Sequence, residues 1–346
     1  MNLHKKLPAL LMLFGTAVSV PALSHAQTAD GFHVLRDIKI GSSGGWDYIR
    51  ADAHLNRVYV SHGNQVNILN AKTGDSVGYI PNTQGVHGIA IVESVGKGYV
   101  SCGRANSVLV FDLKTNDTLE RIPTGKNPDA IFYDPYSKKV YTCNGRSHDA
   151  SVIDVATNKV VATIPLGAKP ETAVSDEKGK IFVNGEDTHE VIEINANTYK
   201  VEHRYNIEEG EEPSGLDIDT KTNRLFIGCG GNKTMVVMDA SNGKNLAKFP
   251  IGRCDGLVFD PELRLVFVSN GEGFISVIKE VNADKFEDVG KIETEPGART
   301  IGIDLATHHL FLPTAKFGPA PAATAENPRP RPRMEPGTFH VIEVGR

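Results

Sequence analysis

Polar and charged side chains recur at one position of a repeated sequence pattern. Aligning the repeats places there Trp46, Asp47, His87, Asp129, Glu171, Ser214, Cys254, Asp255, Arg299 and Thr300. We take Trp46, Asp47, His87, Asp129, Glu171, Ser214, Asp255 and Arg299 as candidate ligand-binding residues. Carboxylates and imidazoles bind divalent metal ions, so His87, Asp129, Glu171 and Asp255 are the alternative metal set. Residues that only cap strands around a water-filled channel would show the same pattern.

The pattern that contains these residues recurs seven times. In each repeat a turn, often with Asp, precedes a hydrophobic run with an aromatic residue at its centre. The aromatic residues are Tyr59, Tyr99, Tyr141, Phe182, Phe226, Phe267 and Phe311, spaced 40, 42, 41, 44, 41 and 44 residues apart. A period near 42 without helical stretches is typical of β-propeller blades. We therefore predict an all-β fold, a seven-bladed β-propeller of four-stranded antiparallel blades.

The two ends of the chain are expected to close the ring. The last repeat supplies a third strand at residues 339–344 and then ends without a fourth. Residues 33–41 resemble the fourth strand of other repeats and precede the first complete one. An open sheet edge invites aggregation. We therefore predict that the N-terminal strand completes the C-terminal blade.

Blade geometry brings the candidate residues to one place. The loop before each innermost strand and the loop between the second and third strands lie on the same face. Side chains from both loops can converge where the central axis opens, which we call the axial mouth. The second set of loops adds His62, Arg104, Arg146, His148, Glu186, Asp187, His189, Lys233 and Glu272, most of which we expect to be solvated.

The repeats resemble the YVTN family of seven-bladed propellers, and the chain is similar to its YncE-like periplasmic members. Residues 58–61, 152–161 and 164–170 carry the resemblance, which extends over residues 32–346. It implies an exported binding or scaffold protein without assigned chemistry. Propellers also host lactonases, lyases and redox partners, so the resemblance leaves activity open.

Residues 1–26 are predicted to be a signal peptide. Lys5 and Lys6 precede an apolar run, and residues 24–26 offer a cleavage site. We expect a periplasmic protein without a transmembrane segment after cleavage. Removing these residues moves the formal charge from −5 to −7, because they contain two lysines and no acid. An acidic balance does not favour nucleic acid as a partner. The unbroken repeat predicts a single domain over residues 27–346, and we expect a monomer.

The four cysteines show no metal or haem motif. CxxC and CxxCH spacings are absent, so covalent haem is not expected. In an oxidising compartment pairing must be considered. Cys229 and Cys254 are the pair we favour, because both lie on the same face of adjacent blades, with four buried free thiols as the alternative.

The last repeat carries a Pro/Arg-rich loop insertion at residues 315–337. Its prolines favour extended structure, and Arg329, Arg331 and Arg333 give it a cationic strip. It could cover the axial mouth as a lid, present a docking strand to another protein, or be a disordered excursion.

Two functional classes remain. The first is an exported binding or interaction protein whose mouth takes a small polar ligand, a metal ion or a periplasmic protein partner. The alternative is a metal-assisted lactonase-type hydrolase or a lyase at the same mouth, with Glu171, Asp129, Asp255 and His87 as ligands or general base.

Overall fold

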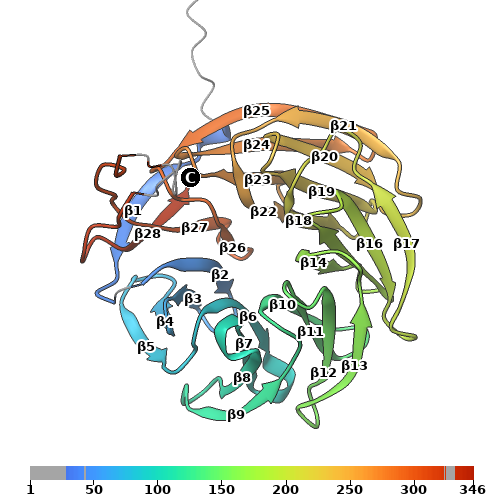
Figure 1. Cartoon of the computed structure of the whole chain (residues 1–346). Helices are drawn as coiled ribbons and strands as arrows, with labels where there is room; N and C mark the ends of the chain where they lie inside the picture. Colours follow the sequence, from blue (N-terminus) through green and yellow to red (C-terminus); the bar gives the residue numbers. More distant parts are fainter. Residues whose placement is uncertain (1–28, 43, 323, 325–331) are drawn as a thin grey trace, which may run out of the picture.

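Seven four-stranded antiparallel sheets are arranged as blades around a central axis (Figure 1). The computed structural model describes residues 29–42, 44–322, 324 and 332–346. The predicted fold, a seven-bladed β-propeller, is thereby confirmed. The predicted signal peptide lies outside the described residues. Within the described residues, no helix is both long and apolar enough to cross a membrane.

Each blade runs outward from the axis in chain order, except the last. Blade one contains β2 (Trp46–Asp52), β3 (Arg57–His62), β4 (Gln65–Asn70) and β5 (Ser76–Ile80). Blade two contains β6 (Val86–Val92), β7 (Lys97–Cys102), β8 (Ser107–Asp112) and β9 (Thr118–Pro123), and blade three contains β10 (Pro128–Asp134), β11 (Lys139–Asn144), β12 (Asp149–Asp154) and β13 (Lys159–Pro165). Blade four contains β14 (Pro170–Ser175), β15 (Lys180–Gly185), β16 (Glu190–Asn195) and β17 (Lys200–Asn206).

The remaining blades follow the same plan. Blade five contains β18 (Pro213–Asp219), β19 (Arg224–Cys229), β20 (Thr234–Asp239) and β21 (Asn245–Pro250), and blade six contains β22 (Cys254–Asp260), β23 (Leu265–Asn270), β24 (Phe274–Asn282) and β25 (Lys285–Glu293). Blade seven contains β26 (Gly302–Asp304), β27 (His309–Thr314), β28 (His340–Gly345) and β1 (His33–Lys39). Short 3-10 turns are η1 (Ala29–Gly31), η2 (Glu93–Val95) and η3 (Gly103–Ala105).

The N-terminal strand is the outermost strand of the last blade. β1 pairs antiparallel with β28, so that His33 lies opposite Gly345 and Lys39 opposite His340. Arg36 of β1 also donates to Glu343 of β28 at 2.5 Å and to carbonyl oxygens of residues 71–73 in blade one. The N-terminal strand therefore joins the last blade to the first.

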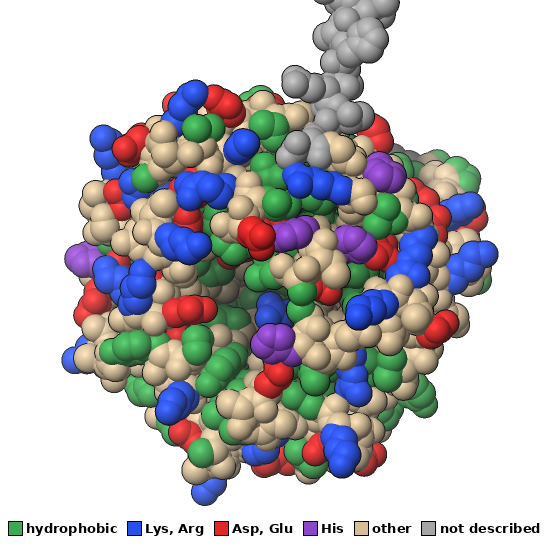
Figure 2. Space-filling model, turned by 180° about the vertical axis from the view of Figure 1, so that it is seen from behind, with side chains coloured by type: hydrophobic (Ala, Val, Ile, Leu, Met, Phe, Trp, Pro, Cys, Tyr) green, Lys and Arg blue, Asp and Glu red, His purple; other side chains and the backbone are tan. Residues whose placement is uncertain are grey.

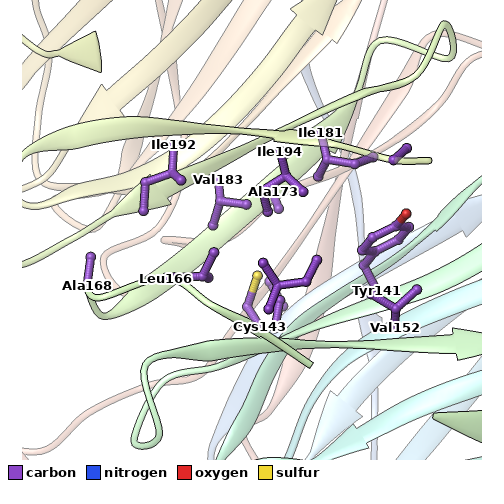
Figure 3. Close-up of a cluster of buried hydrophobic side chains, with 14 residues drawn as sticks. Tyr141, Cys143, Val152, Leu166, Ala168, Ala173, Ile181, Val183, Ile192 and Ile194 are labelled. Carbon is purple, nitrogen blue, oxygen red and sulfur yellow. The ribbon is translucent and has the colours of Figure 1, made fainter. Parts of the chain in front are cut away.

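The repeated aromatic residues fill the spaces between blades. All seven side chains are at most 1% exposed, and each belongs to a separate cluster of buried residues. Figure 3 shows one such cluster, where Tyr141 and Val152 of blade three face Ile181 and Val183 of blade four. Removing a buried aromatic side chain typically costs about 3–5 kcal/mol. The 42-residue period is therefore the spacing of the interblade cores.

Aspartates at the ends of innermost strands form the turns that the sequence repeats. Asp134 accepts the backbone N–H of Ser137 at 2.9 Å, and Asp304 accepts that of Ala306 at 2.9 Å. Such side-chain bonds favour turns over continued strand. In these blades the turns place the second strand beside the innermost strand, with the aromatic residue at its centre.

The cysteines differ from the predicted pairing. Cys229 and Cys254 are both buried free thiols, as are the other two cysteines. Successive side chains of a strand point to opposite faces of its sheet. Cys229 packs with Ile227 in the core beside blade four, whereas Cys254 lies beside Gly228, on the opposite face of the blade-five sheet. The sheet itself thus separates the two sulfur atoms.

The base of the insertion is a short two-stranded ladder. Phe317 pairs with Met334 in an antiparallel bridge. The Gly318 N–H donates to the carbonyl of Arg333 at 2.9 Å, and the Glu335 N–H donates to that of Lys316 at 2.8 Å. Arg329 and Arg331 of the predicted cationic strip lie outside the described residues.

Candidate binding site at the axial mouth

The innermost strands of blades one to six share an irregularity at their start. Their register against the second strand shifts at 46–49, 86–89, 128–131, 170–173, 213–215 and 254–256. Such bulges commonly re-aim side chains. The shifts contain the residues selected from the sequence: Asp47, His87, Asp129, Glu171, Ser214 and Asp255. Figure 2 shows the ring from the side opposite to that of Figure 1, with a hollow near the middle of this face.

Three of these residues form the centre of the site, which we call the mouth triad: Asp47, His87 and Asp129. One potential ligand atom from each lies within 4.8 Å of the others. His87 Nδ1 is 2.6 Å from Asp47 Oδ2 and 3.4 Å from Asp129 Oδ1. Asp129 Oδ1 is buried and accepts no hydrogen bond from the described residues. A single imidazole thus faces two carboxylates.

Glu171 lies beside the triad rather than in it. The Tyr48 hydroxyl donates to Glu171 Oε1 at 3.4 Å and lies 3.2 Å from Thr172 Oγ1. Lys169 Nζ is 3.8 Å from Glu171 Oε2 and also pairs with Glu186. Glu171 therefore has a cation on one side and the acidic triad on the other.

Arg299 pairs with the acidic residue of the neighbouring blade. Its guanidinium forms an ion pair with Asp255 and lies 3.9 Å from Asp47 Oδ1. It also donates to the carbonyl of Trp46 at 3.0 Å, while the Thr300 hydroxyl donates to the carbonyl of Asp47 at 2.7 Å. Asp255 is therefore already paired with a cation and lies outside the triad.

Two other predicted residues have contacts elsewhere. The Trp46 indole packs against Phe317 and Phe339, with ring centroids 5.8 and 5.3 Å away. The hydroxyl of Ser214, near the start of β18, donates to the carbonyl of Glu212 in the preceding loop at 3.2 Å. Trp46, which immediately precedes Asp47, therefore contacts Phe317 at the base of the insertion, and Ser214 stabilises the loop before β18.

The electrostatics of the mouth show an excess of negative charge. Burial, and then the charge of Asp47, raise the pKa of Asp129 to about 7. Burial and Asp129 raise the pKa of Glu171 well above its usual range. Burial alone would lower the pKa of His87, but its hydrogen bond to Asp47 and the charge of Asp129 outweigh this and raise it. The cluster retains protons near neutral pH because its carboxylates are buried and its own cations do not balance their charge.

Sequence reasoning missed residues deeper in the channel. Tyr48 and Arg50 lie two apart on β2, and Asp217 lies on β18. Burial raises the pKa of Asp217 to about 6, although two backbone N–H groups and the charge of Arg50 oppose the rise. The alternation of a strand could have identified Tyr48 and Arg50 as sharing a face. Only the ring brings Asp217 into the electrostatic field of Arg50.

Comparisons with known proteins support the fold. No protein-family model and no curated protein match the chain. It is similar to a chain of the Kuenenia stuttgartiensis hydrazine synthase structure, with 14% identity, 78% of this chain and 93% of that chain covered, and a TM-score of 0.69. It is also similar to a chain of the Mitotic Checkpoint Complex structure, with 12% identity, 99% of each chain covered and a TM-score of 0.69. The structure of U3-55K is similar too, with 12% identity, 91% of this chain and 99% of that chain covered, and a TM-score of 0.72. At these identities the likeness shows the propeller fold alone.

Proposed function

We propose that the protein is an exported, YncE-like propeller of the YVTN type that works in the periplasm as a binding protein. Residues 1–26, which resemble a signal peptide, support export, and the repeated sequence pattern supports this family. A similar propeller in the Mitotic Checkpoint Complex supports an interaction role for such a fold. The mouth triad is the proposed binding centre.

The observation that carries this proposal is the buried oxygen Oδ1 of Asp129, which accepts no hydrogen bond from the described residues and lies 3.4 Å from the His87 imidazole. A buried carboxylate without a donor is costly, and here it lies beside a second carboxylate and a shared imidazole. A cation at this point would replace the proton on His87 Nδ1 and neutralise both acids. We therefore propose that the mouth binds a divalent metal ion or the cationic group of a small polar ligand, with Lys169 and Arg299 available for a ligand's anionic part.

Calorimetric titration of chelator-treated protein tests this proposal. Zn²⁺, Mn²⁺ and Ca²⁺ are titrated separately into the wild type, Asp129→Asn and the exposed control Asp117→Asn. We expect Asp129→Asn to lose one bound ion or to weaken its binding by about 100-fold, and the control to match the wild type. Equal binding by Asp129→Asn and wild type, for every ion, would contradict a cation at the triad.

A second candidate function is supported by the proton affinity of the same residues. A carboxyl group with a pKa near 7 is suited to general acid or base catalysis at neutral pH. The alternative is therefore a metal-assisted lactonase-type hydrolase or a lyase. Turnover of lactones that is lost in Glu171→Ala while the metal is retained would support the enzyme. Affinity without turnover would support the binding protein.

A further inference from the structure

Three potential metal ligands from separate segments meet on blade seven, away from the mouth triad. Asp37 lies on β1, His340 begins β28, and Glu295 lies in the segment between β25 and β26. Their ligand atoms lie within 4.8 Å of one another, and His340 Nε2 is 3.5 Å from Glu295 Oε2. The cluster therefore bridges the ring-closing strand, its partner strand and the connection from blade six.

The hydrogen bonding of His340 defines which nitrogen is available. Nδ1 lies 2.8 Å from the carbonyl oxygen of Thr338, which can only accept, so Nδ1 carries a proton. In the neutral imidazole, Nε2 then presents a lone pair. The side chain is only 7% exposed, and Nε2 is buried without a hydrogen-bond partner among the described residues.

A lone pair facing two carboxylates is unfavourable unless a metal cation or a proton lies between them. All three groups are acceptors in this state, so they repel one another, and the burial of His340 Nε2 is uncompensated. We propose that a divalent transition metal ion such as Zn²⁺ binds here, ligated by His340 Nε2, Glu295 and Asp37. Imidazole nitrogen favours such ions over Ca²⁺ and Mg²⁺.

The geometry and the surroundings fit this ion. Ligand atoms about 2.1 Å from a tetrahedral ion lie about 3.4 Å apart, close to the His340–Glu295 separation. Asp37 is exposed and can move inward to complete the set. The bond from Nδ1 to a backbone carbonyl is the outer-shell contact that metal-binding histidines usually make.

Such an ion would crosslink the segments that close the ring, and we call this proposed metal site the clip. Asp37 and His340 lie on paired strands from opposite ends of the chain, and Glu295 adds the link to blade six. These ligands come together only in the folded propeller. Binding would therefore stabilise the closed ring and hold β1 in place.

The test uses a mouth-silenced protein, the double variant Asp47→Asn with Asp129→Asn, in which the mouth triad has lost its two carboxylates and should no longer bind a metal ion. This variant is treated with a chelator and then titrated with Zn²⁺ alone. We expect one bound Zn²⁺ and a melting temperature raised by about 5 °C at a hundredfold excess over Kd. Adding Asp37→Asn or His340→Gln should weaken binding at least about 100-fold. The exposed control Asp117→Asn should not.

Two results would overturn the clip. One is the absence of Zn²⁺ binding by the mouth-silenced protein, with NMR showing His340 protonated on both nitrogens and paired with Glu295. The other is unchanged Zn²⁺ affinity in Asp37→Asn. If His340→Gln does not fold, Asp37→Asn and Glu295→Gln still decide, because both side chains are at least partly exposed and their replacements are isosteric. Loss of Zn²⁺ affinity in these two variants would support the proposal.

Discussion

Replacing Asp129 by asparagine should stabilise the protein at neutral pH while removing a proposed ligand. The pKa of Asp129 rises from 3.8 to about 7 in the fold, mainly through burial and then through Asp47. This rise corresponds to about 4 kcal/mol of folding stability that is lost when Asp129 ionises. The attraction of His87 and Lys169 for the Asp129 carboxylate is already included in this pKa, but the neighbouring acids share protons with Asp129, and this sharing reduces the cost. We therefore expect a net gain of about 2 kcal/mol in the free energy of unfolding.

The sign follows from proton binding. Between about pH 4 and pH 7 the folded wild type holds a proton on Asp129 that the unfolded chain has released. Its stability contribution is therefore present at low pH and is lost as the pH rises through about 7. Asparagine cannot ionise, so the gain of Asp129→Asn over wild type should be small near about pH 4 and complete near about pH 8.

Urea unfolding at several pH values in the presence of a chelator measures this difference. The exposed control Asp117→Asn should show a difference from wild type that does not change with pH. Adding a cation that binds the mouth triad should remove the advantage of Asp129→Asn, because the ion then stabilises the wild-type carboxylate. A stability difference that is the same at about pH 5 and about pH 8 would refute the reasoning, because Asp129 would then ionise without strain.

Three other predictions concern the rest of the fold. Deleting residues 31–41 removes β1 and should lower the melting temperature sharply, whereas an unchanged melt would show that closure of the last blade is dispensable. A thiol reagent should find no reactive cysteine in the folded protein and four after unfolding without reductant; only two after unfolding would instead indicate a disulfide such as Cys229–Cys254. Deleting residues 317–334 removes Phe317, which packs against Trp46. Trp46 is the one tryptophan of the sequence, so the fluorescence of the protein should shift to longer wavelength as the indole becomes more exposed. The same deletion should alter the affinity of a mouth ligand if the insertion is a lid, and unaltered affinity would exclude that role.

The sequence alone determined the architecture, because the pattern that encodes a blade is local. An aspartate turn, an alternating strand and a buried aromatic residue recur within each stretch of about 42 residues, and each feature depends on near neighbours. Tyr59 and Phe311 occupy equivalent interblade cores although 252 residues separate their positions in the chain. The same repeated pattern predicted where each innermost strand starts. It therefore predicted that Asp47, His87 and Asp129 lie at the same axial mouth.

Only the tertiary structure decided which of these residues meet. Asp255 pairs with Arg299 instead of joining the triad, and Trp46 turns to the insertion. These outcomes depend on the bulges and on the position of each blade relative to its neighbour. The sheet of blade five likewise separates Cys229 from Cys254, and ring closure brings His340 to Asp37. Contacts between segments distant in the chain arise from packing, and no local pattern in the sequence encodes their distances.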